Sequence, residues 1–451
     1  MNRLSWLLLL IVLLLITGCT TALIGVVNTP SPKASQTTDP IKIDHSLDIR
    51  VKDTDSASKD TKDLDSPPKE SSPEEAVPNG KADKHQNNAL NEAANTMGNS
   101  QVISKKNNFA NKTTDKSKEV LSFYTNDEGY LPSSYHTLVK QADSIDWVAP
   151  FWFRLDAAKG SGHVELFKSG TSAFKPMKAK EIVDTAHDKG IKVLAVVHNL
   201  LYGSSATSRN LAHEMVSTEK GRAHFINDLE NILEKYHFDG INMDMEYFRM
   251  DDRDNFSKLM QEMYQTLKPL GYTITISVPA KTRDDRSNSW SGPFDYAAIG
   301  KYADTVVLMT YDEHGYASDP GPIASVGWVE KVINYALTQI PAGKIFMGIP
   351  AYGFDWTQGS KSPKYISYAL AQQTLATSQQ KIRWDNEAKA PYYIYWDKDG
   401  KKHQVWFENA SSLSHKLELV KKYNIKGIGI WRIGMEDPKY WPVIDQYFQK
   451  Q

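Results

Sequence analysis

The sequence contains a single cysteine among its 451 residues, so no disulfide can form within the chain. It also lacks an excess of charge of either sign, with 53 Lys and Arg against 54 Asp and Glu. This balance disfavours a basic nucleic-acid-binding protein and a strongly acidic, solvating one. The fold must therefore be stabilised by a hydrophobic core, and nucleic acid is not an expected partner.

Metal-ligand motifs are missing as well. The 12 histidines are scattered along the chain, and the sequence contains neither an HExxH motif nor a cysteine cluster. We therefore expect no metal ion and no cofactor.

Aromatic residues are absent between Trp6 and Phe109, whereas every tyrosine lies beyond position 120. Residues 20–117 are instead rich in Asp, Lys, Ser, Asn and Pro. Such a segment cannot bury enough apolar area to offset its chain entropy. We expect a disordered polar stalk over 20–117 and a folded domain over 118–451.

The N-terminus combines a basic Arg3 with an apolar run over residues 7–16. This run is short for a membrane span and is typical of a secretory signal. The Ile-Thr-Gly-Cys sequence that ends at Cys19 resembles the bacterial lipobox. That resemblance implies a signal peptide over 1–19, export, and a lipid on Cys19 that anchors the protein to the outer face of the cell membrane. An uncleaved anchor helix is the alternative.

Eight apolar segments with strand character follow one another in the folded domain, separated by amphipathic stretches. They cover residues 120–125, 145–153, 191–199, 238–248, 272–280, 304–312, 344–353 and 425–433. Strand and helix alternating eight times predict an α/β fold, a (β/α)8 TIM barrel. An open doubly wound sheet is the alternative, although no glycine-rich phosphate turn follows the first strand. Residues 357–410 predict a small α+β insertion, a helix plus a hairpin, after the seventh strand.

The strongest chemical signal is DGINMDME over residues 239–246 of the fourth strand. Alternation along a strand places Asn242, Asp244 and Glu246 on one side and the apolar residues on the other. We expect the polar side to face the barrel interior, with Glu246 at the strand end where barrel enzymes carry their chemistry. A fully hydrogen-bonded core network is the alternative interpretation.

This segment resembles the DGxDxDxE signature of glycoside hydrolase family 18. The resemblance implies that Glu246 is the general acid that protonates the glycosidic oxygen, and that Asp244 hydrogen-bonds the 2-acetamido group of the substrate. The carbonyl oxygen of that group would act as the nucleophile, so retaining hydrolysis needs no second protein carboxylate. This mechanism requires no metal or cofactor.

Two further segments resemble the same family. The MTYD sequence at 309–312 resembles its MxYD motif, in which the Tyr311 hydroxyl would bond the acetamido carbonyl and Asp312 would contact substrate. Trp431, in GIGIWRIG, matches the tryptophan that lies under the reacting sugar. Other candidates for the sugar cleft could equally well be packing residues; they are Tyr124, Trp152, His198, Asn199, Trp290 and Glu313.

Two departures from the family pattern narrow the interpretation. Asn242 replaces the first Asp of the DxD pair, and the third strand ends in VVHN (196–199) where chitinases of the family usually show an SxGG-like turn. These features, with VPAKT (278–282) and VWFENASSLSHK (405–416), resemble the bacterial spore-germination and cortex-fragment-lytic N-acetylglucosaminidases.

That resemblance implies cleavage of β-1,4 bonds next to N-acetylglucosamine in peptidoglycan or its fragments. The expected partner is thus a polysaccharide that contains N-acetylhexosamine, and we expect a monomer. A chitinase acting on chitin-like oligosaccharides and a non-catalytic, lectin-like relative are the alternatives. Glu246 favours an enzyme, because the lectin-like relatives typically lack the last Glu of the signature.

Overall fold

The computed structural model describes residues 118–126, 131–167, 176–360 and 362–449. The predicted signal peptide, Cys19 and the stalk over 20–117 lie outside these described residues. Within the described ranges, no helix combines the length and the apolar character needed to cross a bilayer.

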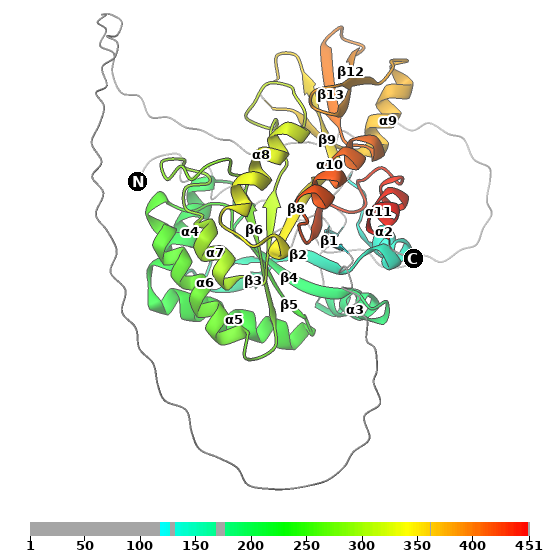
Figure 1. The fold of residues 1–451 in the computed structure, drawn as a ribbon. Helices are drawn as coiled ribbons and strands as arrows, with labels where there is room; N and C mark the ends of the chain where they lie inside the picture. Colours follow the sequence, from blue (N-terminus) through cyan, green and yellow to red (C-terminus); the bar gives the residue numbers. More distant parts are fainter. Residues whose placement is uncertain (1–117, 127–130, 168–175, 361, 450–451) are drawn as a thin grey trace, which may run out of the picture. The chain divides into compact units, whose positions relative to one another are not determined.

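Parallel strands close into a barrel (Figure 1), in the spatial order β1, β2, β4, β5, β6, β7, β8, β14 and back to β1. Their bounds are β1 (Glu119–Tyr124), β2 (Trp147–Leu155), β4 (Lys192–His198), β5 (Gly240–Asp244), β6 (Thr273–Pro279), β7 (Thr305–Met309), β8 (Ile345–Pro350) and β14 (Gly427–Trp431). Each of the eight predicted segments overlaps one of these strands, so the TIM barrel is confirmed. The short β3 (Val164–Leu166), antiparallel to β2, was not predicted.

Helices cover the outside of the barrel (Figure 1). They are α2 (Tyr135–Lys140), α3 (Pro176–Asp188), α4 (Ser205–Ser217), α5 (Glu219–Tyr236), α6 (Arg253–Leu267), α7 (Tyr296–Tyr302), α8 (Val326–Leu337), α10 (Ala410–Lys422) and α11 (Tyr440–Phe448), with the 3-10 helices η1 (Ala142–Ser144), η2 (Met250–Asp252) and η3 (Ala342–Lys344). The helix α5 begins where the Thr218 side chain accepts a hydrogen bond from the Gly221 N–H. Its apolar face, which includes Phe225 and Leu229, is buried in the core.

The barrel strands separate two apolar layers. On β5, Ile241 and Met243 belong to the large cluster between strands and helices. Inside the barrel, Leu121, Phe123 and other side chains form a second, smaller cluster. Alternation along β5 then directs Asn242 and Asp244 to the interior, as the sequence pattern predicts.

The insertion after β8 forms a second sheet in the order β10-β9-β13-β12-β11. It comprises β9 (Tyr352–Thr357), β10 (Lys364–Ser367), α9 (Tyr368–Thr377), β11 (Arg383–Asp385), β12 (Ala390–Trp396) and β13 (Lys402–Phe407). The predicted helix is α9, and the predicted hairpin is β12–β13. The insertion begins earlier than predicted, because the barrel strand ends at Pro350 and the chain enters the second sheet at Tyr352. Both strands are buried, so their apolar sequence continues without a visible break.

Candidate active site

A cavity of about 380 Å³ lies at the carboxyl ends of the barrel strands. This is the end at which TIM-barrel enzymes place their chemistry. The cavity contains most of the predicted site residues. Its lining residues are Phe123, Asp244, Glu246, Pro279, Ala280, Trp290, Met309, Tyr311, Asp312, Trp328 and Trp431.

Asp244 is the last residue of β5, and it is 4% exposed. The Ser277 hydroxyl on the neighbouring β6 lies 3.0 Å from Oδ1 of the fully buried Asn242 and also hydrogen-bonds Asp244. Burial raises the pKa of Asp244 to about 7, and the hydrogen bond with Ser277 opposes this rise. Asp244 therefore titrates near neutral pH.

Glu246 follows two residues after the end of β5 and contributes its carboxyl to the cavity. Removal from bulk water raises its pKa well above the ordinary value for a glutamate. The negative charges of Asp244 and Asp312 raise the pKa further. Glu246 thus keeps its proton at higher pH than a solvated glutamate, which is what a general acid requires.

Tyr311 and Asp312 follow the end of β7. Asp312 is open to the cavity, yet the surrounding protein removes enough bulk water to raise its pKa to about 6. Burial and the nearby carboxylates raise the pKa of Tyr311 well above its usual range, so the phenol stays protonated and can donate a hydrogen bond. The Tyr352 hydroxyl, from β9 of the insertion, donates to Oδ1 of Asp312.

Trp431 ends β14 and is one of the residues that line the cavity. Its ring packs on Phe123 and Phe151 of the barrel interior, with centroid separations of 5.4 and 5.5 Å. The Trp431–Arg432 peptide bond is cis. The indole offers an apolar face on which a pyranose ring could stack.

Residues 119–436 match the family model described as "Glycosyl hydrolases family 18". The chain belongs to this family. The family 18 protein is 35% identical over 260 residues to the "uncharacterized glycosylase YvbX" of Bacillus subtilis, a match covering 57% of this chain and 76% of that protein.

Two crystal structures are similar over the same domain. The Bacillus cereus spore cortex-lytic enzyme SleL superposes with a TM-score of 0.66 at 28% identity, covering 74% of each chain. A chitinase from Chromobacterium violaceum gives a TM-score of 0.66 at 29% identity, covering 74% of this chain and 100% of the chitinase chain. The family 18 protein is therefore a glycosidase whose relatives include a cortex-lytic enzyme and a chitinase.

Two predicted cleft residues lie away from the cavity. Tyr124 and Trp152 pack edge to face in the outer cluster, with ring centroids 5.9 Å apart. Alternation along β1 explains this, because Phe123 lines the cavity and its neighbour must point the other way. Leu121 and Phe123 alternate along β1 and face the barrel interior, and this alternation was the signal that could have excluded Tyr124 from the sugar cleft.

Three more candidates support the site without lining the cavity. The buried Asn199 amide bonds the backbone of Glu246 and Tyr247. His198 stacks on Phe151 at a centroid separation of 3.9 Å, and burial lowers its pKa well below the usual value. Glu313 accepts hydrogen bonds from the backbone and hydroxyl of Ser325, where α8 begins.

Several functional positions were not predicted. Phe123 and Trp328 line the cavity, and Tyr352 holds Asp312. Each of these residues stands in an apolar segment, and the local sequence there does not distinguish a residue that lines a cavity from one that packs in the core. Trp290, one of the weaker candidates, does line the cavity and packs on Tyr247 with a centroid separation of 5.1 Å.

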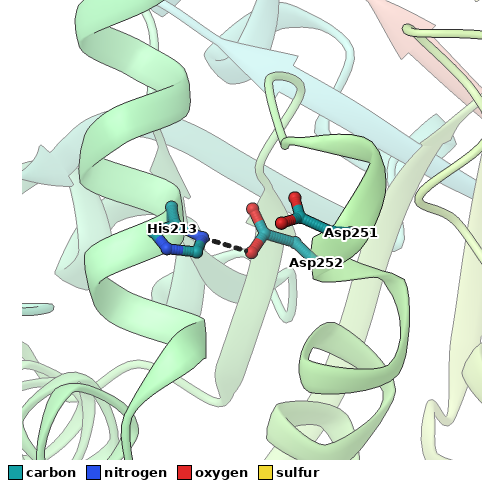
Figure 2. A group of neighbouring side chains, drawn as sticks. All are labelled: His213, Asp251 and Asp252. Atoms are coloured by element: carbon teal, nitrogen blue, oxygen red, sulfur yellow. Dashed lines mark hydrogen bonds and ion pairs between the residues drawn. The ribbon is translucent and has the colours of Figure 1, made fainter.

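Among the described residues, one group of side chains could hold a cation: His213, Asp251 and Asp252 (Figure 2). It lies outside the set that lines the cavity with Glu246. His213 Nδ1 is 2.7 Å from Oδ1 of Asp252, while Oδ2 of Asp252 accepts the Arg249 N–H at 3.0 Å. Asp252 therefore already has hydrogen-bonding partners for both oxygens, as a residue at the start of a helix.

Proposed function

We propose that the protein is a retaining N-acetylglucosaminidase that cleaves β-1,4 bonds next to N-acetylglucosamine in peptidoglycan or its fragments. The observation that carries this proposal is the cavity itself. Asp244 and Glu246 from one strand end share it with Tyr311, and the pKa of Glu246 is raised. The similarity to a spore cortex-lytic enzyme supports a peptidoglycan-derived substrate.

In the first step, protonated Glu246 would donate its proton to the glycosidic oxygen. The substrate's acetamido carbonyl oxygen attacks the anomeric carbon, the bond to the leaving sugar breaks, and that sugar departs as an alcohol. Asp244 would accept a hydrogen bond from the acetamido N–H and stabilise the positive oxazolinium ion. Tyr311 would donate to the acetamido oxygen and orient it.

In the second step, the Glu246 carboxylate would take a proton from water. The resulting oxygen nucleophile attacks the anomeric carbon from the face that the leaving sugar vacated. The oxazolinium ring opens, the acetamido group is restored, and Glu246 is protonated again. Two displacements at one carbon retain its configuration.

The test is mass spectrometry of products from the 118–451 domain incubated with purified peptidoglycan, spore-cortex fragments and chitin oligomers. Wild type should release fragments with reducing-end N-acetylglucosamine. We expect Glu246→Gln to lower turnover by about 100-fold or more, because the amide cannot donate an acidic proton. Sugar binding and folding should be retained, and substantial remaining hydrolysis would show that Glu246 is not the acid.

Hydrolysis of chitin oligomers alone would favour the chitinase alternative, which the full-length match to a chitinase chain supports. Sugar binding without hydrolysis of any substrate would favour a lectin-like protein. The raised pKa of Glu246 speaks against the lectin, since binding alone needs no proton donor.

A further inference from the structure

The general acid stands just beyond the end of regular sheet structure. The last register pair between β4 and β5 joins His198 and Asp244. Glu246 lies two residues further along, where the described ladder no longer fixes the backbone. Something else must hold this segment if the Glu246 carboxyl is to keep its place beside Asp244.

The Asn199 side chain provides that support. Its Oδ1 accepts the Glu246 N–H at 2.8 Å and the Tyr247 N–H at 3.4 Å. Its Nδ2 donates to the Tyr247 carbonyl at 2.7 Å and to the Ser208 carbonyl at 3.3 Å. Two donors face the oxygen and two acceptors face the nitrogen, a pattern that only a carboxamide satisfies.

The amide is itself held rigidly. Asn199 is fully buried, and Ser208 belongs to α4. The neighbouring His198 accepts the Leu200 N–H at 3.0 Å through Nδ1 and stacks on Phe151. The turn after β4 is thus fixed at both sides of Asn199. An SxGG-like turn would place a glycine at this position, and glycine has no side-chain amide.

We propose that Asn199 is a positioning residue for the general acid. Its amide replaces the missing ladder hydrogen bonds and fixes the backbone at Glu246 and Tyr247, which sets the direction of the Glu246 carboxyl. This inference rests on the proposed function, in which Glu246 protonates the leaving sugar. It replaces the expectation that Asn199 contacts the substrate.

Two variants test the role. Asn199→Ala removes the amide, whereas Asn199→Asp keeps the shape and the accepting oxygen but turns a second oxygen toward two carbonyl groups. The matched control is Asn231→Asp, at an exposed position of α5. Steady-state kinetics with a natural glycan are compared with kinetics on 4-methylumbelliferyl N-acetylglucosaminide, whose leaving group needs little protonation.

We expect both Asn199 variants to lower kcat on the natural glycan by about 10- to 100-fold with little change in KM, because a misplaced acid affects the transition state and not binding. The loss on the aryl glycoside should be several-fold smaller. Asn199→Ala combined with Glu246→Gln should be no slower than Glu246→Gln alone, since both changes disable one proton transfer.

A raised KM with unchanged kcat would overturn the proposal in favour of a substrate contact. Equal losses on both substrates, or additive losses in the double variant, would reduce Asn199 to a general structural role and also overturn it. If Glu246→Gln loses activity but the Asn199 variants keep wild-type activity, the positioning role alone is refuted. If wild type hydrolyses none of the glycans, the proposed function fails and the positioning role fails with it.

Discussion

Three carboxyl groups share the cavity, and its described lining residues include neither Lys nor Arg. Each carboxyl therefore has a raised pKa, with burial as the first cause. The negative charges of Asp244 and Asp312 act on Glu246 and favour its protonated form. At this scale the site works through electrostatics, because Asp244 and Asp312 ionise more readily than Glu246 and their negative charges keep Glu246 protonated.

Removing one neighbouring charge should move the pH profile. In Asp312→Asn the Glu246 anion loses a repulsive neighbour, so the pKa of Glu246 falls. The basic limb of the pH profile, where activity is lost as Glu246 ionises, should therefore shift to lower pH. The Tyr352 hydroxyl can still donate to the new amide oxygen. The measurement is kcat/KM against pH for wild type, Asp312→Asn and the exposed control Asp254→Asn. A basic limb that stays in place would show that Glu246 does not govern it.

Burial of Asp244 should also make stability depend on pH. The native state keeps this proton up to about pH 7, whereas the unfolded chain releases it near pH 4, so the free energy of unfolding falls as pH rises between these values. We expect Asp244→Asn to be more stable than wild type by about 1–4 kcal/mol at pH 8. The advantage should disappear near pH 4. Urea unfolding at both pH values measures this, and a wild type that is the more stable protein at pH 8 would contradict it.

Among the elements, the loop between β6 and α7 shows how buried charge shapes the cavity wall. Arg253, at the start of α6, bonds the Asp284 carboxylate at 2.9 Å and the Gly292 carbonyl at 2.6 Å. The fully buried Lys281 ammonium bonds Asp284 at 2.8 Å. These contacts fix the loop that carries Trp290 into the cavity.

Breaking this network should loosen the loop. We expect Arg253→Met to lower the free energy of unfolding by about 1–3 kcal/mol, because Asp295 and the Gly292 carbonyl lose a buried cationic partner while Lys281 still pairs with Asp284. Affinity for glycan oligomers should fall as Trp290 loses its fixed position. Urea unfolding and calorimetric titration measure the two effects. The control Arg283→Met removes an exposed ion pair and should change stability by less than about 1 kcal/mol; equal effects of the two variants would argue against a special role for Arg253.

The identity of the eight barrel strands followed from the sequence, but the ends of several of them did not. The predicted strand over 238–248 extends past the real end of β5 at Asp244, because apolar alternation continues through Met245, which is buried against the helices. The strand over 344–353 contains both β8 and the start of β9. In each case the alternation of side chains continues beyond the point where the strand loses or exchanges its hydrogen-bonded partner. The sequence pattern alone does not show which strand is the partner.

For the whole molecule, the lipobox resemblance leads to a prediction about location. We propose that the protein is exported and anchored to the outer face of the cell membrane through lipid on Cys19. In the full chain, Cys19→Ser should abolish lipid attachment and move the protein out of the membrane fraction, because a serine hydroxyl cannot replace the thiolate nucleophile. Fractionation with metabolic fatty-acid labelling measures this, with the active-site variant Glu246→Gln as a control that should remain attached. An unlabelled wild type would contradict the lipobox.

The sequence by itself determined the (β/α)8 barrel, the family and the group formed by Asp244, Glu246, Tyr311 and Trp431, because strand periodicity and motif spacing are local properties of the chain. The tertiary structure decided which side chains enter the cavity. It turned Tyr124 away, brought Tyr352 from the insertion to Asp312, and placed the Asn199 amide behind Glu246. These contacts join residues up to 47 positions apart. They depend on which strands become neighbours when the barrel closes, and no local pattern specifies that.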